Sequence, residues 1–223
     1  MRFAGMFFDL DDTLVDDDIS TKFGVDQLFL KYTNELVENR DTLWDEALQV
    51  YYPAFLRGEI SVQALQTSRI RYVLKMPDLS EQEALDAFEY FMEHYVESTQ
   101  MFPDTLSVLK SLKASGVRLG VISNGPDEMQ QRKIRAIGLH DFFDVIVTAE
   151  RAGIGKPNSG IFELALSEMG LPASQCCCVG DNLQNDAIGA QEAGLTGIFL
   201  DRSNTAASNY HGLTIQSLEA LLK

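Results

Sequence analysis

Short apolar runs without polar alternation recur along the chain, first near the amino terminus and then through its second half. Phe3 to Phe8 is such a run, and it predicts a strand buried on both faces, as in a parallel sheet. Further strands are predicted at 117–122, 145–148, 176–179 and 196–200. The helices expected between them end at Gly116 and Gly138 and span 161–169 and 186–193. This alternation favours a parallel sheet covered by helices on both faces.

The segment from about Asp17 to Thr99 contains no convincing strand and is predicted to be helical. Its apolar positions recur at helical spacing, first at Phe23, Leu28, Tyr32 and Leu36, and then at Leu43, Ala47, Val50 and Phe55. A third helix is expected over 62–74, and a fourth begins at Ser80, where Glu83 completes a capping box. The first strand must pair with the later strands, since its backbone would otherwise lack partners. We therefore expect a helical module, 17–98, inserted into an α/β core made of 1–16 and 99–223.

Charge and composition narrow the classes of partner. The formal net charge is −15, which argues against nucleic acid or an anionic membrane as a partner. Hydrophobic residues make up 45% of the chain, as in ordinary globular proteins. No apolar stretch approaches the ~20 residues that span a bilayer, and residues 1–8 are too short for a secretory signal. We expect a cytoplasmic protein.

Three cysteines follow one another at Cys176, Cys177 and Cys178. Neighbouring residues of an extended strand point to opposite faces, so neither a disulfide nor a zinc site suits this arrangement. We interpret them as small buried hydrophobic residues in a reducing compartment.

A carboxylate cluster closes the first predicted strand, and this is the first candidate for chemistry. Asp9 and Asp11 are two residues apart and would point the same way in extended chain. Two converging carboxylates repel each other unless a cation or a shared proton separates them, which suggests a hard divalent metal such as Mg²⁺. The competing interpretation is a helix cap or turn, since aspartate favours both.

Polar residues also follow three later strands. Ser123, Asn124 and Gly125 offer a hydroxyl, an amide and backbone N–H groups to phosphate oxygens, although the same residues form common turns. Lys156 precedes a proline and is expected at a helix amino terminus, where its charge hints at a nearby carboxylate or bound phosphate. The competing interpretation is an exposed lysine without a role, which is the more frequent case for Gly-Lys-Pro taken alone. Asp181 is more readily a metal ligand than a turn residue, while helix capping is a credible alternative for the next acid, Asp186.

Taken together and in this order, the four segments resemble the motifs of the haloacid dehalogenase-like (HAD) hydrolase superfamily. The segments are 9–13, 123–124, 156–157 and 180–186. The resemblance covers nearly the whole chain and is to the branch with a helical cap inserted after the first motif. It implies a Rossmann-like, doubly wound parallel sheet and a phosphatase-like hydrolase.

The resemblance implies a two-step phosphoryl transfer. Asp9 would attack phosphorus to form an aspartyl-phosphate, and Asp11 would protonate the leaving alcohol and then activate water. Mg²⁺ would be held by the Asp9 carboxylate, the Asp11 backbone carbonyl and the Asp181 carboxylate. Lys156 would neutralise phosphate charge. The phosphate-binding residues would be Leu10, Asp11, Ser123, Asn124, Gly125 and Lys156. Thr13 and Asp186 would play supporting roles, Thr13 by fixing the first loop and Asp186 by orienting Lys156 or a metal-bound water.

The same residues distinguish the predicted activity from its competitors. A haloacid dehalogenase needs no acid/base two residues after the nucleophile, so Asp11 favours phosphoester hydrolysis. A phosphonatase is disfavoured because that position is not acidic there. A sugar phosphomutase of the β-phosphoglucomutase type keeps this acid and is the nearest alternative. A non-catalytic binding protein on the same fold is a further alternative.

The predicted substrate is a small phosphorylated metabolite, either a sugar phosphate or a nucleoside monophosphate. Which one it is, and whether the chain is a monomer or homodimer, the sequence leaves open. Three arginines of the cap, Arg57, Arg69 and Arg71, could contact an anionic substrate, but solvated surface arginines are expected. Trp44, Tyr51 and Tyr52 are expected to pack in the core of the cap rather than to stack on a base.

Overall fold

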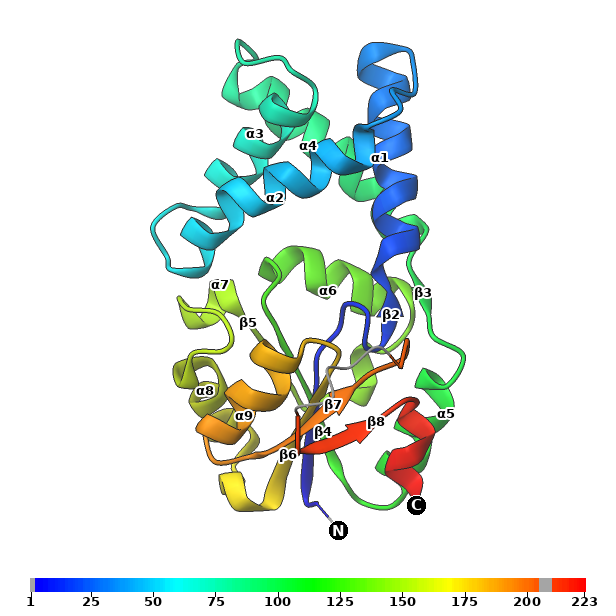
Figure 1. Ribbon diagram of the computed structural model, residues 1–223, viewed down its shortest axis with the longest axis vertical. Coiled ribbons are helices and arrows are strands. Elements are labelled where there is room, and N and C mark those ends of the chain that lie inside the picture. Colours follow the sequence, from blue (N-terminus) through cyan, green and yellow to red (C-terminus); the bar gives the residue numbers. More distant parts are fainter. Residues whose placement is uncertain (1–2, 205–209) are drawn as a thin grey trace. The chain divides into compact units, whose positions relative to one another are not determined.

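The computed structural model describes residues 3–204 and 210–223, and the chain divides into two compact units (Figure 1). One unit combines the residues up to Asp16 with Met101–Lys223, and the other is Asp17–Gln100. The short strands β2 (Val15–Asp16) and β3 (Gln100–Met101), which pair with each other, lie where the chain passes from one unit to the other. Among the described residues, no helix has both the length and the apolar character needed to cross a bilayer.

The larger unit is built on a sheet of six parallel strands in the described part of the chain. Their order across the sheet is β5-β4-β1-β6-β7-β8. The strands are β1 (Gly5–Phe8), β4 (Arg118–Ser123), β5 (Val145–Thr148), β6 (Cys176–Gly180), β7 (Thr196–Leu200) and β8 (Leu213–Ile215). The predicted α/β class with a parallel sheet and an inserted helical bundle is confirmed. The edge strand β8 was not predicted, because its three residues, Leu213 to Ile215, are too few for an alternation to stand out.

Central strands of this sheet are buried on both faces, as the unbroken apolar run of β1 predicts. Met6 pairs with Leu119 on one side and with Cys177 on the other, and these side chains share a single core cluster. Phe7, on the opposite face, is also fully buried. In Figure 1 helices lie on both sides of the strands, with α8 and α9 on one side and α5 on the other.

The connecting helices of this unit fall close to the predicted segments. They are α5 (Thr105–Ala114), α6 (Asp127–Ala136), α7 (Ala149–Ala152), α8 (Ser159–Met169) and α9 (Gly189–Glu192), with short 3-10 turns η1 (His140–Phe142), η2 (Ala173–Gln175) and η4 (Leu218–Leu222). The helix expected over 186–193 begins earlier than predicted, as a π-helical segment, η3 (Leu183–Ile188), that runs directly into α9. The side chain of Asn182 caps it by accepting a hydrogen bond from the Asn185 N–H.

Four helices form the smaller unit: α1 (Asp17–Thr33), α2 (Arg40–Leu56), α3 (Val62–Val73) and α4 (Glu81–Glu97). The capping box predicted at the start of α4 is present, with Ser80 and Glu83 bonded in both directions. Trp44 is buried, and its ring lies 4.2 Å from that of Phe91, so it packs in the core of the unit as expected.

The stripe predicted to be buried on the first helix is wrong at two positions. Phe23 and Leu36 are both exposed, and Leu36 lies beyond the end of α1. The buried face is instead shifted by one residue and includes Ser20 and Gly24. Gly24 lies so close to Phe91 that a Cβ added to the glycine would be only 2.7 Å from the Phe91 ring. Small residues at a close helix–helix contact carry no hydrophobic signal, so periodicity missed them. Val50 of α2 is exposed as well.

The expectation of solvated arginines in this unit is wrong for Arg69. Arg57 is exposed and pairs with Glu59, as expected, whereas Arg69 of α3 is buried with only 6% of its surface exposed. Its guanidinium lies 4.0 Å above the ring of Trp44. Helical periodicity places Arg69 next to Ile70 on the inner face, but the sequence gives no reason for a charge there.

The three consecutive cysteines are free and buried in β6. Burial raises the pKa of the Cys178 thiol well above its ordinary value, so the thiol is protonated and unreactive at neutral pH. They serve as core residues, as their spacing predicts.

Candidate active site

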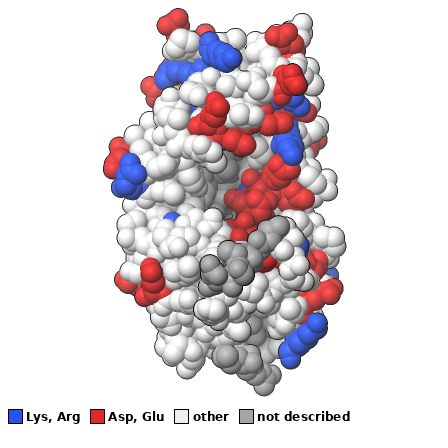
Figure 2. Space-filling view, viewed as in Figure 1, with Lys and Arg blue, Asp and Glu red and all other residues white. Residues whose placement is uncertain are grey.

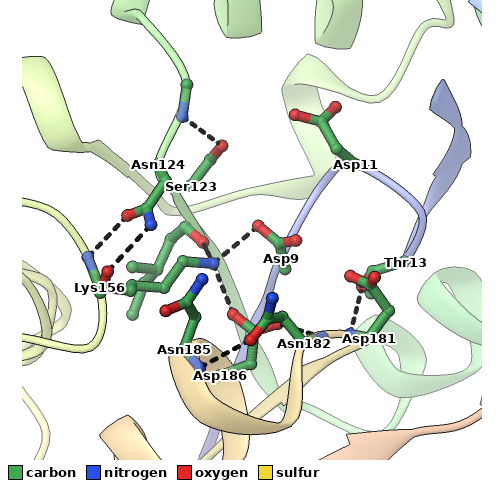
Figure 3. A network of polar contacts seen from close by, with 12 residues as sticks. Asp9, Asp11, Thr13, Ser123, Asn124, Lys156, Asp181, Asn182, Asn185 and Asp186 are labelled. Atoms are coloured by element: carbon green, nitrogen blue, oxygen red, sulfur yellow. Dashed lines mark hydrogen bonds and ion pairs between the residues drawn. The ribbon is translucent and has the colours of Figure 1, made fainter. Parts of the chain in front are cut away.

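The predicted site residues meet at one edge of the sheet because β4, β1 and β6 are adjacent and parallel. The carboxyl ends of these strands deliver Ser123, Asp9 and Asp181 to the same place, and the loop after β5 and α7 brings Lys156 to them. Figure 3 shows these side chains converging from separate segments. Crevices at the carboxyl ends of strands are the usual binding places of open α/β sheets.

Lys156 is the cation at the centre of this arrangement. Its ammonium group donates to Asp9 Oδ1 at 2.7 Å, Asp186 Oδ1 at 2.6 Å and the Ile122 carbonyl at 2.8 Å. The side chain is buried, and although burial by itself lowers the pKa of the amine, the two carboxylates raise it above its ordinary value. Lys156 is therefore permanently charged, and its three protons are all donated.

The predicted position of Lys156 at a helix amino terminus is wrong. Helix α8 begins at Ser159 with Asn158 as its cap, and Lys156 lies before it in a loop that includes a cis Lys156–Pro157 peptide. The carboxylate partner that the charge of Lys156 suggested is present, since both Asp9 and Asp186 accept hydrogen bonds from its ammonium group. The backbone N–H and C=O of Lys156 are hydrogen-bonded to the side-chain amide of Asn124, at 2.6 and 3.0 Å. Asn124 therefore holds the lysine loop.

Three carboxylates form a compact group suited to a cation. Oxygen atoms of Asp9, Asp181 and Asp186 all lie within 4.8 Å of one another. Burial and the neighbouring acids Asp186, Asp11 and Asp181 raise the pKa of Asp9 well above its ordinary value, against the opposing effect of Lys156. Burial and Asp186 raise the pKa of Asp181 to about 6. Three oxygen ligands in mutual repulsion fit a hard divalent ion such as Mg²⁺, which would relieve that repulsion.

Thr13 and Asp181 fix two of the loops to each other. The Thr13 hydroxyl donates to Asp181 Oδ1 at 3.2 Å and accepts from the Asp181 backbone N–H at 3.0 Å. Thr13 is completely buried. The threonine thus ties down the loop after β1, and its partner is the predicted metal ligand.

Asp186 approaches the site because Gly180 leaves room for it. A Cβ at Gly180 would clash with the carboxyl group of Asp186, so only glycine is compatible with this position. The second oxygen of Asp186 accepts a hydrogen bond from the Asn182 N–H at 2.9 Å. Asp186 is therefore part of the carboxylate group as well as the partner of Lys156, whereas the sequence assigned it a supporting role.

The prediction that the Asp11 side chain points the same way as Asp9 is wrong. Figure 3 shows Asp11 directed away from the three carboxylates. Strand β1 ends at Phe8, and the chain turns sharply at Asp12, where φ is +55°, so the alternation of extended chain does not continue to Asp11. The Asp11 carboxylate instead forms an ion pair with Lys133 and accepts from Gln130 Nε2 at 2.7 Å.

Gln130 and Lys133 of α6 are completely buried, and the sequence analysis missed both. They lie on the same helix face as Ile134, at positions that a buried stripe would fill with apolar residues. Two polar residues in a buried stripe were the signal that could have identified them. Lys133 and Gln130 thus give Asp11 its own cation and amide donor, whereas Asp9 is paired with a different lysine, Lys156.

The last residue of β4, Ser123, contributes a hydroxyl that is able to donate a hydrogen bond. Ser123 Oγ accepts from the Gly125 N–H at 3.1 Å and from Gln130 Nε2 at 2.9 Å, which leaves its proton for a ligand oxygen. Gly125 is needed here because a Cβ would clash with the side chain of Gln130. In the first loop, Leu10 is buried and its carbonyl accepts from the Leu14 N–H at 2.9 Å.

Among the charged side chains on the face shown in Figure 2, acidic ones cover more surface than the lysines and arginines, which appear in scattered groups. A phosphate ester approaching the chain meets an unfavourable overall field of net charge −15. Local cations and the hydroxyl and N–H donors of the strand-end loops must therefore supply its binding energy.

Comparisons with known proteins agree with this geometry. The chain is 35% identical over 210 residues to the glyceraldehyde 3-phosphate phosphatase of Methanothermobacter thermautotrophicus, covering 92% of this chain and 89% of that protein. It is 29% identical over 202 residues to the pyrimidine 5'-nucleotidase YjjG of Escherichia coli, covering 90% and 87%.

Solved structures with the same fold include the HAD-hydrolase YfnB of Bacillus subtilis, with a TM-score of 0.84, 22% identity and coverage of 99% and 97%. A 2-haloacid dehalogenase from Pseudomonas syringae gives a TM-score of 0.77 at 29% identity, with the same coverage. The family model of the haloacid dehalogenase-like hydrolases matches residues 3–194. The chain therefore belongs to the haloacid dehalogenase-like hydrolase family.

Proposed function

We propose that this hydrolase is a Mg²⁺-dependent phosphatase of small phosphate monoesters. The observation that carries the proposal is the separation of two acids by two buried lysines. Asp9 is paired with Lys156 at 2.7 Å within the carboxylate group, and Asp11 is paired with Lys133 outside it. The two acids thus have separate partners and different surroundings, which allows them separate roles as nucleophile and as acid/base. The named phosphatase and nucleotidase among its relatives support the same activity.

In the first step Asp9 attacks phosphorus and forms an aspartyl-phosphate, while Asp11 gives its proton to the leaving alkoxide. In the second step Asp11 takes a proton from water, which hydrolyses the acyl-phosphate. Lys156 and the Ser123 hydroxyl neutralise and hold the phosphoryl oxygens. The side chain of Asn124, predicted to bind phosphate, would act here through the backbone of Lys156, to which it is bonded.

The carboxylates of Asp9 and Asp181 and the backbone carbonyl of Asp11 would hold Mg²⁺, with Asp186 beside them. The bound ion would supply positive charge that lowers the repulsion between the phosphate and these acids. We further propose a cytoplasmic location, in keeping with the three free cysteines. A monomer or homodimer is expected, and residues 17–98 would act as the cap over a core of 1–16 and 99–223.

The proposal is tested by a phosphate-release screen over sugar phosphates and nucleoside monophosphates. Turnover should require Mg²⁺ and be lost in Asp9→Asn, whereas Asp141→Asn, which removes an exposed acid of the same unit, should leave it unchanged. Phosphate release that survives Asp9→Asn would refute a role of Asp9 as nucleophile.

Three alternatives are distinguished by assays of the same purified protein. A phosphomutase would interconvert sugar phosphates and depend on a bisphosphate primer, without net release of phosphate. A dehalogenase, suggested by the Pseudomonas syringae structure, would release halide from 2-haloacids without Mg²⁺. A binding protein would be stabilised by its ligand without turnover.

A further inference from the structure

Helix α6 places one glutamine, Gln130, between two groups of the candidate site. The Nε2 atom of Gln130 donates one hydrogen bond to Asp11 Oδ2 at 2.7 Å and another to Ser123 Oγ at 2.9 Å. The side chain is completely buried. Asp11 lies in the loop after β1 and Ser123 is the last residue of β4, so one side chain from a third element links the two. All three residues belong to the larger unit.

The Asp11 carboxylate determines which way round the Gln130 amide lies. Asp11 forms an ion pair with Lys133, so its oxygens accept hydrogen bonds. The reverse orientation of the amide would put two oxygen atoms 2.7 Å apart and is therefore excluded. The amide nitrogen carries two hydrogens, and both are donated, one to Asp11 and one to Ser123.

The bond from Gln130 determines what the Ser123 hydroxyl can do. A serine oxygen has two lone pairs, and here the Gly125 N–H, at 3.1 Å, and the Gln130 amide occupy both. The hydroxyl proton is thus directed away from these two donors. Without the amide, one lone pair is open and the hydroxyl rotates more freely. The loop is shaped to admit the amide, since a Cβ at Gly125 would lie 2.0 Å from Gln130 Nε2.

Gln130 makes these bonds at the expense of its own oxygen. The Oε1 atom is buried and has no hydrogen-bond partner in the described part of the chain. Asn124 differs, because both ends of its amide are bonded to the Lys156 backbone. An unpaired buried acceptor is costly, and native proteins satisfy nearly all such groups. A side chain that serves its neighbours and leaves its own oxygen unpaired is typical of a functional site rather than of a residue kept for stability.

We propose that Gln130 is a positioning residue of the reaction, whose amide holds Asp11 in place and directs the Ser123 hydroxyl toward the phosphoryl group. This inference rests on the proposed phosphatase function, and it adds a residue that acts through two others without touching the substrate. It has a specific consequence for an apolar side chain of similar length. Gln130→Met removes two hydrogen bonds and one unpaired acceptor together, so its effects on stability oppose each other, while both bonds to the site are lost.

Turnover forms the first arm of the test, with the best-hydrolysed ester of the phosphate-release screen as substrate. Gln130→Met should lower kcat by about tenfold to a hundredfold, the loss expected for a hydrogen bond to a charged group, and raise KM by less than about fivefold. Gln130→Glu keeps the shape but puts an acceptor beside Asp11 in place of a donor, so kcat should fall further. Gln191→Met is the matched control, since it removes an exposed glutamine amide of the same unit and should leave kcat unchanged.

Binding of inorganic phosphate in the presence of Mg²⁺, measured by calorimetry, forms the second arm and needs no turnover. Gln130→Met should weaken phosphate binding by about two- to fivefold, because Ser123 Oγ then has one fixed donor fewer. In a Ser123→Ala background the same change should weaken binding by less than about 1.5-fold, since no hydroxyl is left to direct. Such a dependence on the background would show that Gln130 acts through Ser123.

Stability distinguishes a positioning residue from a packing residue. In Gln130→Met the Asp11 side chain, which is 31% exposed, keeps its ion pair with Lys133, and Ser123 keeps the bond from the Gly125 N–H. Neither group is therefore left buried without a partner, and the urea midpoint should stay within about 0.5 M of the wild type. A residue kept only for packing would show the opposite pattern, a lower midpoint with unchanged turnover.

A fall in the kcat of Gln130→Met at a nearly unchanged urea midpoint supports the proposal. Turnover within about twofold of the wild type overturns it while the phosphatase function stands, and so does phosphate binding that responds equally with and without the Ser123 hydroxyl. Should the wild type hydrolyse no ester, the phosphatase function fails and the phosphate arm decides the role of Gln130; a wild type that also binds no phosphate overturns both. Should Gln130→Met not fold, Gln130→Glu decides, and wild-type turnover in that variant overturns the proposal.

Discussion

Replacing Lys156 with methionine tests whether one buried cation holds the site together. Methionine keeps the length of the side chain and removes the ammonium group, so the packing changes little while the charge is lost. The wild-type ammonium satisfies Asp9 Oδ1, Asp186 Oδ1 and a backbone carbonyl, all within 2.8 Å. In the variant two buried carboxyl groups face each other without a cation.

Removing one member of a buried ion pair costs about 3–5 kcal/mol, because the remaining charge is left buried and uncompensated. We expect the free energy of unfolding of Lys156→Met at neutral pH to fall by about that amount. This is a large share of the ~5–15 kcal/mol that stabilises a typical domain. Mg²⁺ would replace part of the missing charge and restore up to about 3 kcal/mol at a hundred times its Kd.

The loss of stability in Lys156→Met should also depend on pH, and the direction of this dependence follows from the raised pKa of the Asp9 carboxyl group. Without Lys156 the pKa of Asp9 rises further above its ordinary value, so the folded state holds protons that the unfolded state releases. The stability of the variant is then greatest at low pH and falls as pH rises through the raised pKa. The difference from the wild type should shrink as the pH is lowered from about 8 to about 5.

Urea unfolding followed by circular dichroism measures these quantities, with and without Mg²⁺. Lys110→Met is the matched control, because it removes an exposed lysine from the same unit and should change stability by less than about 0.5 kcal/mol. A loss in Lys156→Met below about 1 kcal/mol, or one that is the same at every pH and Mg²⁺ concentration, would refute the electrostatic account.

Three further changes probe the other parts of the site. Lys133→Met should lower kcat by about a hundredfold or more, because Asp11 loses the ion pair that positions it. Mg²⁺ should stabilise this variant as much as it stabilises the wild type. An unchanged kcat would contradict the role of the ion pair. Gly180→Ala should destabilise the protein by about 1–3 kcal/mol because its Cβ collides with Asp186, and a wild-type urea midpoint would show that the loop gives way freely. Mg²⁺ binding should weaken as pH falls through about 6, where Asp181 takes up a proton, and calorimetry showing no pH dependence near that value would contradict the raised pKa.

Much of the site could be predicted because parallel strands end together. Asp9, Ser123 and Asp181 each follow an apolar run, and any arrangement that pairs these runs in parallel brings their ends to one edge. Gly116, Gly138 and Gly170 marked the helix ends correctly, and all three have positive φ in the structure. Glycine is common just after a helix because it adopts this backbone conformation without strain.

Other features depend on neighbours that are distant in the sequence. The side chain of Asp11 leaves Asp9 because the chain turns at Asp12, and it is held by Lys133, which is 122 residues away. The place of Asp186 in the carboxylate group depends on the space above Gly180. Neither relation leaves a pattern that periodicity or spacing can detect.

The sequence by itself determined the order of the strands and helices, the insertion of a helical segment, and the types of residue at each strand end. Hydrophobic burial and backbone hydrogen bonding are local in pattern, so they can be read along the chain. Only the tertiary structure decided which charges neutralise one another, because electrostatic partners are fixed by distance in space and by burial. Three examples are the ion pair of Asp9 with Lys156, the ion pair of Asp11 with Lys133, and the lack of an ionic partner for Arg69 within the described residues.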